Sequence, residues 1–270
     1  MNLLENHTIL YDEDCPMCHV YTGAFIKFGW LPKNGREAYQ NMPDHVCKLI
    51  DHQRAVNEIA LVNTVNGEVT YGISSLFKII ANALPVFKPL FRFAPFIWFM
   101  KKIYAFVSYN RKVIIPAKIK ENVLQPSFSL KYRLAYLTFA WLITSIILTK
   151  YTAMLTNFVP IGNSYREYLI CGGQMVFQAA IIIFYKKDKL WDYLGNMMTV
   201  SLAGALILIP ALIVNHFLII NTVFYLLFFL FTAGLMLLEH IRRCKILDLG
   251  WLMSITWVTY RLIVLVLILL

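Results

Sequence analysis

The stretch that decides the fold of the N-terminal half is 8-TILYDEDCPMCH-19. Its apolar start, residues 9–11, predicts a buried β-strand, and the mixture of apolar and polar residues in 20–30 predicts a helix that packs over this strand. Cys15 and Cys18 therefore lie where a strand passes into a helix. A Cys-x-x-Cys pair at such a junction suits dithiol chemistry, because the sulfurs are one helical turn apart and the helix N-terminus favours a thiolate.

These residue types assign roles within the motif. We expect Cys15 to be the more exposed nucleophile and Cys18 to resolve the mixed disulfide. Pro16 suits the first helical turn, where its missing N–H group is not needed. Carboxylates near Cys15 would raise its pKa, so we interpret Asp12 and Asp14 as proton carriers for Cys18 or as residues that orient the loop. Unchanged thiol pKa values and exchange rates in Asp12→Asn would contradict this interpretation.

Two segments carry a resemblance to a known family. Residues 11–18, YDEDCPMC, resemble the opening signature of the DCC family, whose members are thioredoxin-like and are described as predicted thiol-disulfide oxidoreductases. Residues 103–111, IYAFVSYNR, are similar to the closing Tyr…Asn-Arg helix of that family. The resemblance covers roughly the first 115 residues and implies a redox-active cysteine pair with no tightly bound cofactor. The chain departs from the family pattern at Glu13, where glycine is expected, and at Ser74-Ser75, where an acidic residue and alanine are usual.

Other interpretations of the cysteine pair remain open. His19 completes a Cys-x-x-Cys-His string, which also occurs at c-type haem attachment sites. Such attachment takes place outside the cytoplasmic membrane, whereas the topology predicted below places this motif inside, so haem is disfavoured. Zinc is the stronger rival, because the segment offers enough nitrogen and sulfur ligands for a four-coordinate site. The candidate ligands are Cys15, Cys18, His19, His45, Cys47 and His52. A fold remnant without catalysis is the third possibility.

The rest of the N-terminal half supplies further elements. Residues 31–53 are polar and contain proline and glycine, which predicts a loop with a short helix near 43–52. Residues 57–72 predict two strands joined by a tight Asn-Gly turn, and Ser74 or Ser75 is expected to cap a helix that follows. This order is typical of a thioredoxin-like α/β domain. No proline lies just before Glu58, where the cis-proline of ordinary thioredoxins would face the sulfurs.

Composition divides the chain into two parts. Of its 270 residues, 59% are hydrophobic and 15% are charged, and the apolar excess follows residue 133, so we expect a membrane protein. The start lacks a basic segment followed by a long apolar run, which predicts no signal peptide. The net charge of +10 comes from cations beside apolar segments. That placement favours an anionic membrane surface and argues against a nucleic-acid partner.

Aromatic and basic residues alternate in 84–115, within the predicted N-terminal domain 1–115. Charges and prolines interrupt this segment too often for it to span a bilayer. It suits the membrane–water interface, with rings at headgroup depth, or alternatively a helical cap over the domain core. Residues 116–133 are expected to form a polar linker.

Residues 134–270 predict an all-α transmembrane bundle of about five helices. Each apolar segment has roughly the 20 residues that cross a bilayer. The segments are 134–154, 168–185, 193–214, 217–238 and 251–270. Lysine and arginine concentrate before the first segment and in every second loop, so the positive-inside rule predicts an inner (cytoplasmic) membrane protein with its N-terminal domain in the cytoplasm and its C-terminus outside.

Arg261 lies near the middle of the last apolar segment. A lipid-facing arginine there would be unfavourable, so we expect it to point inward. It would then meet an anionic ligand, such as a quinone or a lipid headgroup, or hydrogen-bond to Gln178 or Asn196.

Three further cysteines complete the total of five. Cys47 lies alone in a polar stretch, where most cysteines are inert. Cys244 is flanked by basic residues in a predicted cytoplasmic loop, where it could exchange with Cys15, carry an acyl group or have no role. Cys171, near the outer end of the second apolar segment, could join a transmembrane electron relay only with a partner cysteine.

Two functions follow from these observations. The first is a membrane-anchored, cytoplasmic-facing thiol-disulfide oxidoreductase that uses the CPMC dithiol and an unidentified protein or small-molecule thiol as partner. The second is a non-enzymatic membrane subunit or assembly factor whose thioredoxin-like domain docks a partner or binds a metal.

Overall fold

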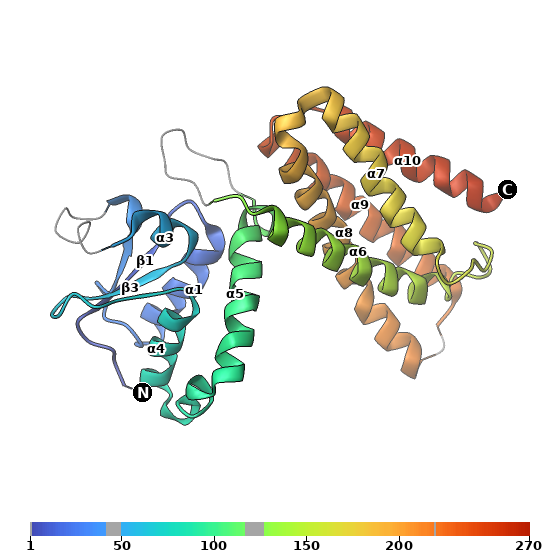
Figure 1. Ribbon diagram of the computed structural model, residues 1–270. Coiled ribbons are helices and arrows are strands. Elements are labelled where there is room, and N and C mark those ends of the chain that lie inside the picture. The colour runs from blue at the N-terminus through green and yellow to red at the C-terminus, as the bar shows by residue number, and fades with distance from the viewer. Residues whose placement is uncertain (1, 42–49, 117–126, 219) are drawn as a thin grey trace. The chain divides into compact units, whose positions relative to one another are not determined.

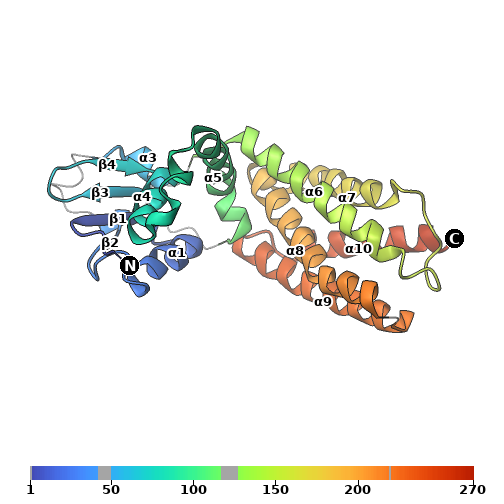
Figure 2. The same cartoon turned by 90° about the horizontal axis from the view of Figure 1, so that it is seen from below.

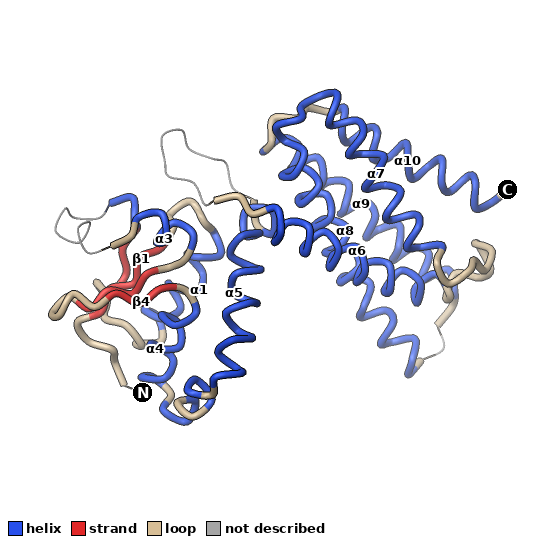
Figure 3. The backbone as a smooth tube through the Cα atoms, viewed as in Figure 1, coloured by secondary structure: helices blue, strands red, loops and turns tan. Residues whose placement is uncertain are grey.

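The chain forms two compact units, Met1–Tyr132 and Arg133–Leu270 (Figure 1). The computed structural model describes all residues except 1, 42–49, 117–126 and 219, and the side chains of residues 41 and 52 are also excluded. The predicted helix near 43–52 lies almost entirely outside the described residues. Figure 3 shows that the strands all belong to the first unit and that the second is helical.

A four-stranded mixed sheet forms the centre of the first unit. Its strands are β1 (His7–Tyr11), β2 (Arg36–Ala38), β3 (Ala60–Asn63) and β4 (Val69–Tyr71). Figure 2 shows them in the order β2-β1-β3-β4. β1 pairs in parallel with β2 and antiparallel with β3, and β3 pairs antiparallel with β4. The predicted strand at 9–11 and the pairing of the two hairpin strands are therefore confirmed. The tight Asn-Gly turn is not, because β3 ends at Asn63 and β4 begins at Val69, so a longer loop, 64–68, joins them.

Both faces of this sheet are buried, which explains the continuous apolar run in β1. Ile9 and Leu61 pack on one face against Phe25 of α1 (Pro16–Lys27) and Ile79 of α4 (Ile73–Ala83). Leu10 packs on the other face, in a cluster that includes a residue of α3 (His52–Asn57). Since successive side chains of a strand point to opposite faces, a strand buried on both faces must be apolar throughout.

Helix α4 starts differently from the prediction. Its N-cap is Gly72, with φ of 63°, and neither Ser74 nor Ser75 caps it through a side chain. The Ser75 hydroxyl instead donates a hydrogen bond to the carbonyl of Thr70, 2.7 Å away. Glycine is favoured at this turn, because residues with a Cβ atom rarely adopt this backbone conformation, with φ of 63° and ψ of −137°.

The basic aromatic segment forms two short 3₁₀ turns and a long helix. These elements are η2 (Pro85–Phe87), η3 (Leu90–Arg92) and α5 (Ala94–Ile114). One face of α5 covers the sheet domain: the Tyr104 hydroxyl accepts a hydrogen bond from the Ile59 N–H at 3.1 Å, and the Ser108 hydroxyl donates one to the carbonyl of Asn57. This face of α5 therefore forms a helical cap over the domain core, which was one of the two interpretations of the segment.

Among the residues that the structure describes, five long helices make up the second part of the chain. They are α6 (Leu130–Thr152), α7 (Arg166–Lys186), α8 (Leu190–Phe217), α9 (Thr222–Ile246) and α10 (Leu252–Leu269). By length and apolar composition, four helical stretches among the described residues can cross a membrane, and one of them, Arg166–Phe217, contains both α7 and α8. The non-helical backbone of Lys186 and the turn η4 (Lys187–Lys189) separate these two helices, which run in opposite directions in Figure 1.

The boundary between the third and fourth predicted segments is wrong by several residues. Helix α8 continues to Phe217, and α9 begins at Thr222, where the side chain of Asn221 accepts a hydrogen bond from the N–H of Val223. Apolar composition alone could not place this turn, because residues 217–220 are as apolar as the helices on either side.

The second unit places polar groups inside and large apolar groups outside. Arg243 donates hydrogen bonds to Glu239 at 2.7 Å and to Asn196 at 2.9 Å. The buried Tyr193 hydroxyl donates to Gln178 at 2.9 Å and lies 3.2 Å from Nε2 of His240. Many leucine and phenylalanine side chains are exposed, with Phe184 as an extreme at 92%. This distribution is the one expected of helices surrounded by lipid.

Arg261 is not held by the predicted hydrogen bonds. Its guanidinium carbon lies 4.2 Å from the ring centroid of Trp257, a cation–π contact, and its Nε is buried without a hydrogen-bond partner among the described residues. The oxygen atoms of Gln178 and Asn196 accept from Tyr193 and Arg243 instead. The aromatic face of Trp257 therefore replaces the expected amide partner.

Candidate functional site: a buried cysteine pair beside an Asp–Arg ion pair

The cysteine pair lies at the junction between β1 and α1, as predicted. Cys15 is the N-cap of α1, and its sulfur accepts a hydrogen bond from the N–H of Cys18 at 3.4 Å. Pro16 occupies the first turn, where no N–H is needed. Both cysteines are reduced and buried, Cys15 with 7% and Cys18 with 3% of its surface exposed. Cys15 is thus the slightly more accessible of the two.

The two thiols share one proton. The hydrogen bond from the Cys15 thiol lowers the pKa of Cys18 to about 6; burial opposes this shift, while the charge of Arg111 and a hydrogen bond from Tyr21 reinforce it. The same thiol–thiol hydrogen bond, with burial, raises the pKa of Cys15. This hydrogen bond therefore favours a single negative charge on the pair.

A buried ion pair holds the loop that precedes the cysteines. Oδ2 of Asp12 lies 2.8 Å from a guanidinium nitrogen of Arg111, and the two side chains are only 8% and 6% exposed. The same nitrogen donates to the carbonyl of Val56 at 2.7 Å. This pair connects the loop, α3 and α5.

The other carboxylate oxygen of Asp12 is also occupied. Oδ1 accepts hydrogen bonds from the N–H of Asp14 and from the amide of Gln40, both at 3.1 Å. The carbonyl of Asp12 accepts from the N–H of Cys15 at 3.1 Å. Of the two roles expected for Asp12, these contacts favour orientation of the loop. Asp14 enters this arrangement through its backbone N–H.

Two residues of the site, Arg111 and Tyr21, lie outside the Cys-x-x-Cys motif and were not predicted from it. Tyr21 lies one turn after Cys18, and its hydroxyl donates to the Cys18 sulfur at 3.5 Å. Arg111 belongs to the segment 103–111, whose similarity to the closing family helix was the one sequence signal that could have identified it. Residues near the start and near the end of the first unit's sequence therefore come together to form the site.

The predicted zinc ligands are only partly described. Both ring nitrogens of His19 are engaged, Nε2 with the carbonyl of Glu13 and Nδ1 with the guanidinium of Arg36, each at 2.7 Å. His45 and Cys47 lie outside the described residues, as does the side chain of His52. Within the part of the chain that the structure describes, no three histidine, cysteine or acidic residues form a cluster that could hold a metal ion.

The two cysteines of the helical unit occupy different surroundings. Cys244 lies within α9 rather than in a loop, with 2% of its surface exposed, and its sulfur is 3.6 Å from Nδ1 of His240. The predicted loop position is wrong because α9 continues through the basic residues to Ile246. A buried thiol is poorly placed for acylation or for exchange with Cys15. Cys171, in α7, is half-buried.

Asp12→Asn is expected to shift the pH dependence of thiol reactivity to lower pH. The negative charge of Asp12 raises the pKa of Cys18, so its removal should lower that pKa further below about 6. The measurement is the rate of alkylation of the Cys15–Cys18 peptide against pH, followed by mass spectrometry in the full-length protein. Asp14→Asn is the control and should move the midpoint less. A midpoint that rises in Asp12→Asn would contradict this electrostatic account.

Comparisons of the chain with models of protein families, with curated proteins and with solved structures gave no match.

Proposed function

We propose that this protein is a membrane-anchored thiol-disulfide oxidoreductase of the DCC type, with Cys15 and Cys18 as its reactive dithiol. The observation that carries the proposal is the capping geometry: the Cys15 sulfur accepts the N–H of Cys18 at the start of α1. A helix N-terminus and the nearby charge of Arg111 both stabilise a thiolate. A shared proton and a lowered pKa are what thiol exchange at neutral pH requires.

The strand arrangement supports a thioredoxin-like domain. A β-α-β unit that begins with β1 and ends with β2 is followed by the antiparallel hairpin β3–β4 and then by α4, which is the order expected from the sequence. The sheet order β2-β1-β3-β4 puts β1 at an interior position. The loop after β1 therefore opens beside α1, α3 and α5, and these elements supply the residues around the sulfurs.

In the proposed reaction, the Cys15 thiolate attacks one sulfur of a substrate disulfide, forms a mixed disulfide and releases the first substrate thiolate. Cys18 then attacks the Cys15 sulfur, forms the Cys15–Cys18 disulfide and releases the second substrate thiolate. Two electrons pass from the dithiol to the substrate. The proton shared by the two sulfurs and one proton from solvent end on the two substrate thiols. A second dithiol, of protein or small-molecule origin, restores the reduced pair by the reverse exchange.

The helical unit supplies the anchor. We propose five crossings, with α7 and α8 each spanning once, and a cytoplasmic N-terminal domain on the inner membrane. Lys186, Lys187 and Lys189 lie between α7 and α8, and Arg242, Arg243 and Lys245 lie near the end of α9, at the predicted cytoplasmic ends. A reducing cytoplasm favours reduction of a substrate over oxidative folding.

The deciding experiment is the reduction potential of the Cys15–Cys18 pair in purified full-length protein analysed for metal. The protein is equilibrated with glutathione or dithiothreitol redox buffers, and free thiols are trapped and counted by mass spectrometry. We expect a reversible two-electron transition in protein that contains no zinc. Absence of a transition, or thiols that react only after chelation, would contradict the oxidoreductase proposal.

The alternative is a non-enzymatic module that docks a partner or binds a metal. The low exposure of both sulfurs favours it, since a folded protein disulfide has little access to them. The positive charge of Arg111 beside the thiols argues against a bound cation there. The same redox titration separates the two functions.

A further inference from the structure

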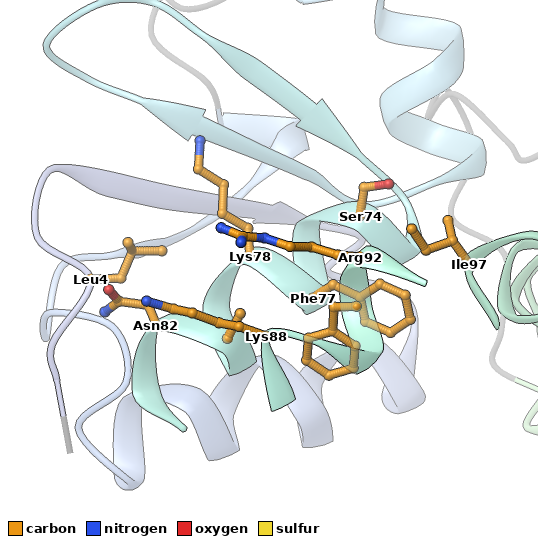
Figure 4. Close-up of a pocket in the computed structure, with 10 residues that line it drawn as sticks. Leu4, Ser74, Phe77, Lys78, Asn82, Lys88, Arg92 and Ile97 are labelled. Atoms are coloured by element: carbon orange, nitrogen blue, oxygen red, sulfur yellow. The ribbon is translucent and has the colours of Figure 1, made fainter. Parts of the chain in front are cut away.

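A second feature of the N-terminal unit is a cleft away from the cysteines. Its volume is about 450 Å³, and residues of α4, η3 and α5 form most of its wall (Figure 4). Phe77 and Phe91 stack in its apolar part, with ring centroids 4.2 Å apart. Lys78, Lys88 and Arg92 also line it. The cleft thus combines an aromatic floor with three cations.

Two of these cations have no acidic partner among the described residues. Lys78 pairs with Glu68 at 3.2 Å on the exposed surface, whereas no ion pair engages Lys88 or Arg92. Their side chains extend in the same direction, away from the ring of Phe77, in Figure 4. No aspartate or glutamate occurs between residues 69 and 116, a range that includes η2, η3 and α5. The positive charge of this surface is therefore uncompensated within its own elements.

The segment that carries these cations also exposes large aromatic side chains. Phe93, Trp98 and Phe99 are 59%, 64% and 55% exposed. Phe93 follows Arg92 as the N-cap of α5, and Trp98 and Phe99 lie in the first turns of that helix. The ammonium group of Lys102 lies 5.7 Å from the Trp98 ring centroid. Exposed rings next to lysine and arginine are typical of protein surfaces at the headgroup layer of a bilayer.

We propose that this surface, formed by η2, η3 and the exposed face of α5, binds the anionic headgroup layer of the bilayer in which the helical unit is anchored. Lys88 and Arg92 hold the phosphate group of an anionic phospholipid at the cleft, and Trp98 and Phe99 enter the interface. The N-terminal unit then has a membrane contact of its own, beyond the anchor and the redox reaction.

The length of the connection supports this occupant. Helix α5 ends at Ile114 and the first apolar helix begins at Leu130, so the chain between them spans at most about 55 Å even when fully extended. Trp98 lies a further distance of about 24 Å from Ile114 along α5. Once α6–α10 are inserted, the surface is thus tethered within roughly 80 Å of the bilayer, which raises its effective concentration there. Charge attraction and insertion of aromatic rings act together at such a surface.

The test uses the full-length protein in lipid nanodiscs. Discs of phosphatidylcholine are compared with discs containing about 30 mol % phosphatidylglycerol, each with and without brominated acyl chains that quench nearby tryptophan. The Trp98 signal is the difference between wild type and Trp98→Phe. We expect quenching of Trp98 in discs with phosphatidylglycerol and much less in phosphatidylcholine alone.

The variant Lys88→Gln/Arg92→Gln should weaken docking by about 30-fold, with most of the Trp98 quenching lost. Its matched control is Lys27→Gln/Lys33→Gln, which removes the same charge from exposed positions of the same unit and should retain the quenching. Trp98 that is unquenched in both lipids, or equal losses in the two double variants, would overturn the proposal. Failure of the protein to enter nanodiscs would instead contradict the membrane anchor, so the two failures are distinguishable.

Discussion

Replacement of Arg111 with glutamine is expected to destabilise the N-terminal unit by about 3–5 kcal/mol. The substitution leaves the Asp12 carboxylate, whose side chain is 8% exposed, without the guanidinium 2.8 Å away. The carbonyl of Val56 loses its donor as well. Urea titration followed by hydrogen exchange of peptides from β1 and β3 measures this loss, because these strands form the core of the unit.

Two control variants define what the Arg111 result means. Lys78→Gln removes a cation from an exposed ion pair and should cost at most about 0.5 kcal/mol. Asp12→Asn/Arg111→Met leaves no uncompensated buried charge and should be more stable than Arg111→Gln. Equal stabilities of Arg111→Gln and Lys78→Gln would show that the buried pair does not hold the loop.

Arg111→Gln is also expected to shift the pKa of Cys18, in the opposite direction to the shift expected for Asp12→Asn. Because the charge of Arg111 lowers the pKa of Cys18, its removal should raise that pKa and move thiol alkylation to higher pH. The two substitutions thus shift the profile in opposite directions although each breaks the same ion pair. General loosening of the loop would shift both profiles in the same direction.

The elements predicted correctly in the N-terminal unit have local signals. The apolar run of β1 and the proline at the start of α1 each determine the structure of a few neighbouring residues. Asn66-Gly67 correctly marked the connection between β3 and β4, although that connection is longer than a tight turn. Strand β2 (Arg36–Ala38) has no such signal, because it is three residues long and two of them are charged. Its parallel pairing with β1 places it in the sheet, and a local pattern does not reveal that pairing.

The candidate site was predictable only in its local part. Cys15, Pro16 and Cys18 are neighbours in sequence, so their positions at the helix start follow from helix geometry. Arg111 is 99 residues from Asp12 and reaches it only after α5 has packed against the domain. Charge burial of this kind is a tertiary property, which residue spacing in the motif could not indicate.

Replacement of Cys15 with serine is expected to reduce disulfide exchange by at least about 10³-fold, as for loss of a covalent nucleophile. Cys18→Ser should react once and then stop as a mixed disulfide on Cys15, because no second thiol resolves it. The assay is the reduction of a small disulfide by the full-length protein, with the trapped adduct located by mass spectrometry. Cys171→Ser is the matched control and should exchange at the wild-type rate.

The location of the adduct also decides which sulfur attacks. Accessibility and the N-cap position favour Cys15, whereas the lowered pKa places the thiolate on Cys18. These observations are compatible if the proton moves between the hydrogen-bonded sulfurs before attack, since the more accessible thiolate then reacts although it is the less populated one. An adduct on Cys18 in the Cys15→Ser protein would reverse the roles. No adduct in either variant would mean that the pair does not exchange at all.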